Sequence, residues 1–465
     1  MLKGGSVENS IHPPLAHQDL NNIDKPPPSL KEALKVWLSI GLLSFGGPAA
    51  QIALIHREVV DKRHWLGEPQ FLNALNFCML LPGPEAMQLV TYMGWRLNGY
   101  LGGLIAGLLF VLPGALVILA LAALYISLGD VAIVDALFLG VKATVVVIVI
   151  QALLRVAKKE LISSVHKAIA VIAFVGLFFL NIPYPLIILG AAIVGAACLR
   201  QQADQESIGN VHHSSRHSSL PSWRTTVITI LVGLAIWWIP VFLLDYFVQI
   251  PILSEMATFF STLAVVTFGG AYSVLAYMTQ DVVAIKGWLT TGEMMTGLGL
   301  AETTPGPLIL VTEFVGFFAA YREGGWWLGV AGAAVTLWVT FVPCFLWIFT
   351  GGPYIDWLSA QPRLRNALSA ITAAVVGVML SLSIWFALHV FFQQIGQQQW
   401  RLWGSESLGL TFSLWQPVIS SLNLSVVALV VFGAYLLLKR QWSVAAVLGA
   451  SSVAAGVLFV CKSVF

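Results

Sequence analysis

The sequence predicts an all-α integral membrane protein with about 13 transmembrane segments. We expect two inverted homologous repeats with helices broken by Gly and Pro. Of the 465 residues, 58% are hydrophobic and 10% are charged, with a mean hydropathy of +0.84, whereas soluble domains carry about 25% charged residues. Apolar segments long enough to cross a bilayer recur along the chain. Finally, the triplet Pro-Gly-Pro occurs twice, at 82–84 and 305–307, inside apolar surroundings.

The two triplets belong to an internal repeat. Phe45-Gly46-Gly47 recurs as Phe268-Gly269-Gly270 at the same offset that relates the two Pro-Gly-Pro triplets, and Trp65-Leu66 falls on Trp288-Leu289. An ungapped register kept across several motifs indicates duplication of one unit.

Candidate spans follow from apolar stretches of about 17 to 25 residues. We predict them near 33–55, 71–95, 100–127, 131–154, 168–181, 183–199, 224–247, 257–279, 294–320, 326–350, 364–392, 413–437 and 441–461. The lone segment 224–247 would make the second six spans start from the opposite side, which inverts the repeats, as in many secondary transporters. Whether 33–55 and 257–279 cross fully or are re-entrant stays open.

The organisation predicted from these segments begins with a disordered tail and continues with two repeats joined by a linker and one span. The predicted units are the tail 1–29, the first repeat 30–199, the polar linker 200–223, the connecting span 224–247 and the second repeat 248–465. With the N-terminus inside, the positive-inside rule is met except by Arg57, Lys62 and Arg63. Either their loop is functional, steering anions toward a cavity, or 33–55 is re-entrant.

The broken segments predict a binding site. Pro removes a backbone donor and Gly permits positive φ, and irregular backbone at membrane depth is tolerated only where protein covers it or it lines a cavity. Paired breaks in two halves point to a transporter's binding site, and half-helix N-termini attract anions. Small residues that allow close helix packing are the alternative explanation. The predicted binding residues are Ser44, Gly46, Gly47, Pro82, Gly83, Pro84, Lys142, Thr267, Gly269, Gly270, Thr303, Thr304, Pro305, Gly306 and Pro307.

Ionisable groups at membrane depth are costly and therefore functional candidates. Lys142 is a candidate countercharge for a dianion, or else the partner of an internal acid. Glu85, Glu302 and Glu313 are candidates for carrying coupling protons. For Glu85 and Glu302, capping of a helix at a break is the alternative.

Several functions are disfavoured. A formal net charge of +2 gives no case for nucleic-acid binding, and the cysteines Cys78, Cys198, Cys344 and Cys461 are too far apart to indicate a metal site. The Ser/His run around His212, His213 and His217 reads as a solvated loop. No phosphate-binding loop for ATP and no catalytic triad is visible, so we expect no enzyme, no cofactor and no metal, and transport driven by a gradient.

The motifs resemble the long two-domain type of the chromate ion transporter family. The resemblance rests on Phe45-Gly46-Gly47-Pro48, Leu81-Pro82-Gly83-Pro84-Glu85-Ala86, Gly102-Gly103 and Leu112-Pro113-Gly114, and on 267–272 and 299–307 in the second half. It covers roughly 30–460 and implies a multi-pass protein of the inner (plasma) membrane. It also implies export of chromate, driven by the proton gradient or membrane potential, and hence chromate resistance.

The halves depart from symmetry, since Pro48 is matched by Ala271 and Glu85 by Leu308, so we expect one oxyanion site rather than two equal sites. The alternatives are a sulfate or other oxyanion carrier and an oxyanion channel, with a membrane-bound reductase disfavoured. The expected partners are chromate or a sulfate-like oxyanion, a coupling proton or counter-ion, the lipid bilayer and, as an option, a second copy in a homodimer.

Overall fold

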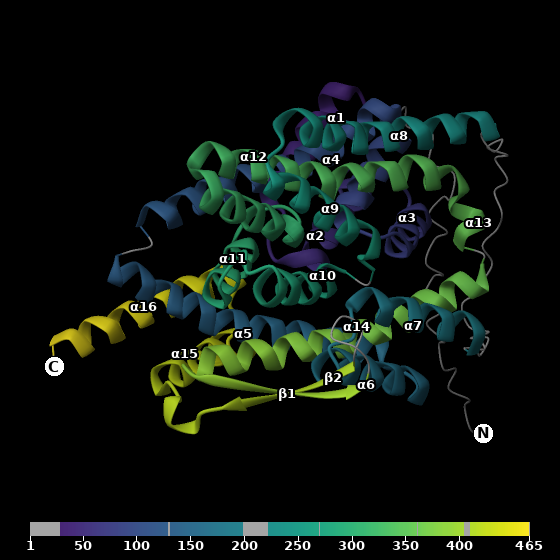
Figure 1. Ribbon diagram of the computed structural model, residues 1–465. Coiled ribbons are helices and arrows are strands. Elements are labelled where there is room, and N and C mark those ends of the chain that lie inside the picture. Colours follow the sequence, from purple (N-terminus) through teal and green to yellow (C-terminus); the bar gives the residue numbers. More distant parts are fainter. Residues whose placement is uncertain are drawn as a thin grey trace, which may run out of the picture.

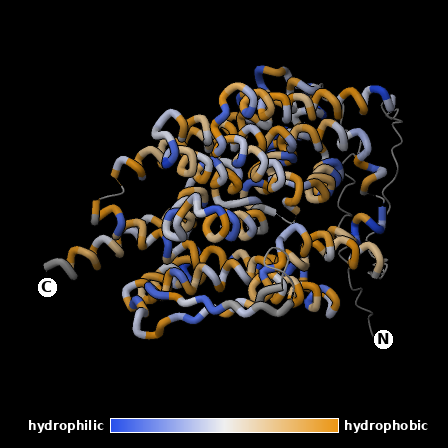
Figure 2. Tube along the Cα trace, viewed as in Figure 1, coloured by the Kyte–Doolittle hydropathy of each residue, from blue (hydrophilic) through white to orange (hydrophobic). Residues whose placement is uncertain are grey.

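The computed structural model describes residues 28–128, 131–198, 222–268, 270–359, 361–403 and 410–464, which are mostly helical. Gly269 and most of the polar linker lie outside these ranges. Figure 1 shows long helices lying across the molecule with shorter ones between them. Six helical stretches are long and apolar enough to cross a membrane, and Figure 2 shows that hydrophobic residues dominate them. The chain is therefore a multi-pass membrane protein.

The two halves repeat one order of elements around a connector. The first half holds α1 Leu30–Leu43, α2 Gly47–His56 with the π-helical turn η1 Arg57–Asp61, α3 Glu68–Leu80, α4 Glu85–Leu128, α5 Ala132–Glu160, α6 Ser164–Phe178 and α7 Tyr184–Cys198. The connector is α8 Trp223–Leu243 with η2 Leu244–Val248. The second half holds α9 Pro251–Val266, α10 Ala271–Thr279 with η3 Gln280–Ile285, α11 Thr291–Thr303, η4 Leu308–Leu310, α12 Val311–Gly351, η5 Gly352–Tyr354, α13 Ile355–Ser359, α14 Pro362–Phe391, β1 Ile395–Trp403, β2 Leu410–Pro417, η6 Ile419–Ser421, α15 Leu424–Ala434, η7 Tyr435–Lys439 and α16 Val444–Val464.

Helices α4 and α12 are each two helices joined by a sharp turn. Asn98 and Gly99 leave helical geometry in α4, as do Gly324 and Gly325 in α12. After the turn the chain folds back, because a Cβ added to Gly102 would lie 2.4 Å from the carbonyl oxygen of Gly94. The first parts are residues 85–97 and 311–323, and the second parts are residues 100–128 and 326–351.

Each half contains two helical hairpins. We call α1 with α2 hairpin A and α3 with 85–97 hairpin B; in the second half, α9 with α10 is hairpin C and α11 with 311–323 is hairpin D. Ring contacts join the two arms of each hairpin in the first half, with centroids 5.9 Å apart for Trp37 and Trp65 and 5.8 Å apart for Phe77 and Tyr92. A straight helix would separate the second pair by about 22 Å, so the arms lie side by side.

The hairpins of the second half close in the same way, through ion pairs at their open ends. Lys286 pairs with Glu255 across hairpin C, and Arg322 donates to Glu293 at 2.6 and 2.7 Å across hairpin D. Each hairpin thus returns to the face from which it enters. The expectation that 71–95 and 294–320 each cross the membrane is therefore wrong, and the open question over 33–55 and 257–279 is settled in favour of re-entrant hairpins.

Equivalent helices of the two halves run antiparallel. Gly107 packs on Phe345 and Gly103 on Phe349, so residues 100–128 and 326–351 run in opposite directions. Likewise, the start of α14 is hydrogen-bonded to the start of α6, just after α5 ends, through Ser369 and His166. The end of α14 lines a cavity together with the early part of α5, through His389 and Lys142, so α5 and α14 run in opposite directions. Hairpins A and B therefore enter from one face, the A/B face, and hairpins C and D from the other, the C/D face. The repeats are inverted, as the sequence predicts.

The basic residues are distributed unequally over these faces. Asn98 donates to the carbonyl oxygen of Pro28, which places the turn of α4 beside the start of α1 on the A/B face. The re-entrant path of hairpin A places Arg57, Lys62 and Arg63 on this face too, which removes the exception to the positive-inside rule. The described Lys and Arg residues that lie elsewhere are Lys142, Lys286, Arg322, Arg401 and Lys462.

One element departs from an all-helical chain. The predicted span 413–437 begins as β2, which pairs with β1 in an antiparallel hairpin, and only then continues as α15. Ser413 donates its backbone N–H to the carbonyl oxygen of Phe179 at 2.7 Å, so the β-hairpin packs against the end of α6. Apolar Leu410, Phe412 and Leu414 alternate with polar Thr411 and Ser413, as in a strand.

Candidate functional site

The tips of hairpins from opposite halves are hydrogen-bonded to each other. The N–H of Gly83, in the tip of hairpin B, donates to the carbonyl oxygen of Thr267 in hairpin C at 3.0 Å. The N–H of Gly306, in the tip of hairpin D, donates to the carbonyl oxygen of Ser44 in hairpin A at 3.1 Å and to its Oγ at 2.8 Å. Each half thus donates the N–H of its Pro-Gly-Pro tip to the other half, and a two-fold axis between the halves produces such reciprocal contacts. The structure thus interlocks each Pro-Gly-Pro with the other half's Phe-Gly-Gly.

Glycine is required at the centre of both Pro-Gly-Pro tips. The φ angles are +121° at Gly83 and +90° at Gly306, a region that costs other residues about 1–3 kcal/mol. Space is also short: a Cβ on Gly83 would lie 2.8 Å from Nε2 of Gln88 and 3.0 Å from Sγ of Cys344. The tip of hairpin B is therefore packed against the second part of α12.

The predicted hydroxyl ligands lie at the tips but are engaged by their own helices. Ser44 donates to Gly41, Thr303 to Leu300 and Thr304 to Ala301, at 2.8, 2.8 and 3.1 Å, and Thr267 donates to Leu263. Each acceptor is a backbone carbonyl in the last turn, where such groups lack an intrahelical partner. In this conformation these hydroxyl groups cap the C-terminal ends of α1, α9 and α11. Each hydroxyl would have to give up its bond to the helix carbonyl before it could donate to an oxyanion.

Two glutamines hold the tips, and the sequence analysis did not name them. Nε2 of Gln51 donates to the carbonyl oxygens of Gly306 at 2.7 Å and Ser44 at 3.2 Å, and Nε2 of Gln88 donates to that of Pro82 at 2.6 Å. Both glutamines are buried within apolar helices. That isolation is the signal that could have revealed them, because a buried amide needs partners.

The remaining tip residues differ in exposure between the halves. Gly83 and Pro84 are buried, as are Pro305, Gly306 and Pro307, whereas Pro82 and Gly47 are half-buried and Gly46 is exposed beside Phe45. Gly270 closes the tip of hairpin C with φ +92°. Helices α2 and α10 therefore begin at the tips, with their N–H groups directed to the centre of the molecule.

The three acidic candidates occupy different environments. Oε1 of Glu85 lies 3.6 Å from the point where a Cβ on Gly270 would sit, so this carboxyl lies between the N-termini of α4 and α10. Glu302 is buried in the last turn of α11. Glu313 is 1% exposed, and its Oε2 has no hydrogen-bond partner among the described residues.

A pair of threonines faces the helix arm that carries Glu313. Gly316, one turn after Glu313, packs against Thr336 so tightly that an added Cβ would lie 2.1 Å from its Oγ1. The antiparallel register then brings Thr340 level with Glu313. The Oγ1 atoms of both threonines also lack partners among the described residues. One turn further along the helix lies Cys344, beside the tip of hairpin B.

Lys142 is not at the breaks. Its Nζ lies 3.2 Å from the position of a Cβ on Gly292, at the start of α11, and α11 is about 16 Å long from Gly292 to the break at Thr303. The structure therefore does not bring Lys142 together with the other predicted binding residues.

The basic loop of hairpin A surrounds one carboxylate. Nζ of Lys62 donates to Glu58 at 2.7 Å, Nη1 of Arg63 does so at 2.5 Å, and Nε of Arg57 lies 3.6 Å away. Burial would raise the pKa of Glu58, but the hydrogen bonds from Lys62 and Arg63 outweigh it and leave that pKa below the usual value. Part of the positive charge is thus neutralised locally, while Arg57 and Lys62 stay more than half exposed.

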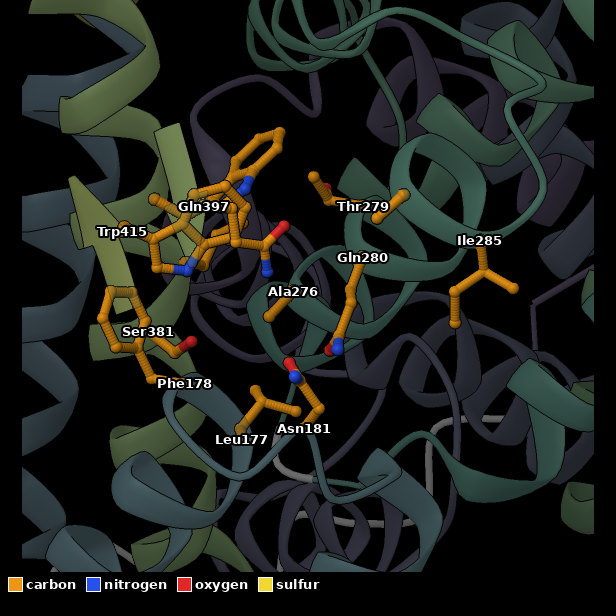
Figure 3. A pocket seen from close by; sticks show the side chains of 13 residues that line it. Leu177, Phe178, Asn181, Ala276, Thr279, Gln280, Ile285, Ser381, Gln397 and Trp415 are labelled. Atoms are coloured by element: carbon orange, nitrogen blue, oxygen red, sulfur yellow. The ribbon is translucent and has the colours of Figure 1, made fainter. Parts of the chain in front are cut away.

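A cavity of about 290 Å³ lies between α6, η3, α14 and the β-hairpin. Figure 3 shows the amide groups of Asn181 and Gln280 close together, with Thr279, Ser381 and Gln397 around the same space. Among the described residues, the lining holds polar but no charged side chains. In the register of the repeat, Gln280 corresponds to Arg57, so the C/D face is neutral where the A/B face is basic. No cluster of three metal-binding side chains occurs in the described ranges.

Comparison with known proteins gives one consistent result. A family model described as chromate transporter matches residues 31–196 and 254–464. A chromate transport protein from Pseudomonas aeruginosa is 30% identical over 80% of this chain and 84% of its own length, and one from Cupriavidus metallidurans is 25% identical over 76% and 81%. An uncharacterized transporter of Bacillus subtilis, YwrB, is 32% identical over 34% of this chain and 81% of its own length. No solved structure matches.

Proposed function

Because this chain belongs to the chromate transporter family, we propose that it is a secondary active transporter that exports chromate from the cytoplasm and so confers chromate resistance. The family is one of transporters rather than of enzymes, and its substrate is an oxyanion. The observation that carries the proposal is the interlocking of four hairpin tips from two inverted halves. Paired breaks of this kind surround the substrate in other inverted-repeat transporters.

The charge distribution supports export. The A/B face holds most basic residues and is cytoplasmic by the positive-inside rule, so its field raises the local concentration of cytoplasmic anions. The corresponding lining on the C/D face is neutral at Gln280, which favours release. Arg57, Lys62 and Arg63 contribute only a small part of this field, since Glu58 neutralises some of their positive charge.

The oxyanion would bind at the tips, one at a time. Breaking the bonds of Gly83 and Gly306 to the opposite half frees two backbone N–H donors, and the helices that begin at the tips add the partial positive charge of their N-termini. The carboxyl group of Glu85 lies against Gly270, whereas its counterpart Leu308 carries no such group. Because carboxyl oxygens disfavour an oxyanion beside them, the anion would bind at the pair formed by hairpins A and D.

Glu313 is the strongest of the three candidates for the coupling proton. An ionised carboxylate without a partner costs a few kcal/mol at membrane depth, so Glu313 is held protonated until water or the substrate path reaches it. The threonines that face it and Cys344 form a line along one helix toward the tip of hairpin B. Movement of that tip would therefore alter the surroundings of the carboxyl.

Everted membrane vesicles test the proposal. Labelled chromate should accumulate inside vesicles that contain the protein when respiration energises them, and a protonophore should abolish the accumulation. Sulfate in excess reports selectivity, since chromate and sulfate are both tetrahedral dianions. Accumulation equal to that of protein-free vesicles would refute export, and accumulation suppressed by equimolar sulfate would identify a general oxyanion carrier instead.

A further inference from the structure

Lys142 is a partly buried lysine without a carboxylate partner. It lies on α5, and no Asp or Glu of the described ranges comes within 4.0 Å of its amine. The side chain turns away from the interlocked tips and reaches the start of α11 at Gly292. Lysines at membrane depth are usually paired with an opposite charge, so a partly buried amine without one favours the binding of an anion.

Two cavities of about 510 Å³ each open beside Lys142 on the C/D face. One is lined by Thr291 and Gly292 of α11 and by His389 of α14, and Asn423 borders both. Since one water molecule takes roughly 30 Å³, either cavity holds a tetrahedral oxyanion together with part of its hydration shell.

The donors around Lys142 suit an oxyanion. Oδ1 of Asn423 accepts the N–H groups of Ser425 and Val426 at 3.1 and 3.3 Å, so its amide NH₂ remains as a donor. The N-terminus of α11 adds partial positive charge. Lysine itself acts as a compact point charge that binds oxyanions without a fixed geometry.

Nearby acids do not cancel this charge. Glu293 is held by two hydrogen bonds from Arg322 and by the capping bonds of Thr290. Asp135 borders the second cavity two turns before Lys142 on α5, outside ion-pair range. Among the described lining residues, the other titratable side chain is His389, whose Nδ1 lies 2.9 Å from the carbonyl oxygen of Trp385.

We propose that Lys142, the start of α11 and Asn423 form a second oxyanion site on the C/D face, separate from the hairpin tips. It rests on the proposed function: an exported anion leaves the tips, pauses at Lys142 and is then released outside. The site is about 16 Å from the tips, so both can be occupied in sequence. The ligand class is a small tetrahedral dianion.

Site-specific alkylation tests the proposal, with sulfate as the probe because chromate oxidises thiols. Thr291→Cys is exposed in intact cells to a membrane-impermeant maleimide, and modification at that residue is quantified by mass spectrometry. Millimolar sulfate should slow the modification at least threefold, whereas chloride at equal ionic strength should not. Lys142→Met should remove the protection and Lys142→Arg should keep it.

Lys286→Met is the matched control, because Lys286 lies on the same face but is paired with Glu255. It should leave the protection by sulfate unchanged. Equal protection with and without Lys142, or modification only from the cytoplasmic side, would overturn the inference. The same experiments separate the inference from the proposed function. If sulfate protects Thr291→Cys but the protein moves no chromate, export is refuted and the site is kept. If the protein exports chromate but sulfate gives no protection, the site is refuted and export is kept.

Discussion

Gly83→Ala tests the interlocked tips with the smallest change. Gly83 has φ +121°, and its added Cβ would lie 2.8 Å from Nε2 of Gln88 and 3.0 Å from Sγ of Cys344. Neither neighbour can retreat freely, since Gln88 donates to Pro82 at 2.6 Å and Cys344 is fully buried. The tip of hairpin B must therefore move, and its bond to Thr267 is lost.

The size of the effect follows from two free-energy costs. The backbone conformation costs alanine about 1–3 kcal/mol, and the lost hydrogen bond removes about 0.5–1.5 kcal/mol. The closed arrangement of the tips is thus destabilised by about 1.5–4.5 kcal/mol. In the proposed mechanism the tips open to bind the anion and must close again in every transport cycle. A difference of about 1.4 kcal/mol is a factor of ten, so we expect the less favourable closure to lower the initial rate of chromate transport at least tenfold.

Gly99→Ala is the control. Gly99 has φ +67° in the turn of α4, and a Cβ there meets no atom within 4 Å. It carries similar backbone strain without touching a tip, so we expect transport within about threefold of wild type at equal protein in the membrane. Transport by Gly83→Ala at the wild-type rate, or an equal loss in Gly99→Ala, would refute the role of the tips.

Three further predictions concern other residues. Glu313→Gln should abolish gradient-driven accumulation of chromate in everted vesicles but keep the exchange of chromate across the membrane. Glu323→Gln, at the exposed end of the same arm, should transport normally. Accumulation by Glu313→Gln would exclude the coupling role. Gln51→Leu should lower the thermal stability of the detergent-solubilised protein by about 1–3 kcal/mol, since the carbonyl of Gly306 loses a 2.7 Å bond; an unchanged melting temperature would contradict this. The hydrogen bond to Glu68 raises the pKa of His56, so the stabilisation it gives hairpin A is present at low pH and lost as pH rises through that pKa. Hydrogen exchange in residues 62–67 should therefore quicken with pH beyond its intrinsic increase, and His56→Gln should remove the excess; an equal pH dependence in both would contradict it.

Much of the fold followed from repeats of apolar segments and from two glycine motifs. The register that relates Gly83 to Gly306 predicted paired breaks, and the lone segment that became α8 predicted inversion. Hydropathy did not distinguish a span from a re-entrant hairpin, because the two arms of a hairpin, as in 33–55, form one apolar stretch of spanning length. The unequal distribution of basic residues did carry that information, since the loop holding Arg57, Lys62 and Arg63 violated the positive-inside rule only if hairpin A crossed.

The site was harder to predict than the fold, because its contacts join residues far apart in the chain. The repeat indicated that the tips correspond to each other, but not that Gly83 would meet Thr267 and Gly306 would meet Ser44. The place of the Lys142 amine could not be predicted either, because its long side chain carries the amine away from the centre toward the C/D face, as lysines at membrane depth often do. Gln51 and Gln88 escaped notice because the repeat does not mark them: Val274 and Val311 stand at the corresponding positions.

Transport by the purified protein in liposomes tests most directly whether this chain alone moves chromate through its interlocked tips against a gradient. Labelled chromate is supplied outside, and a potassium diffusion potential makes the lumen positive, as in energised everted vesicles. We expect accumulation above the external concentration that collapses with the potential and is at least tenfold slower in Gly83→Ala than in Gly99→Ala. Flux no greater than in empty liposomes, or flux that only equilibrates chromate, would contradict secondary active export.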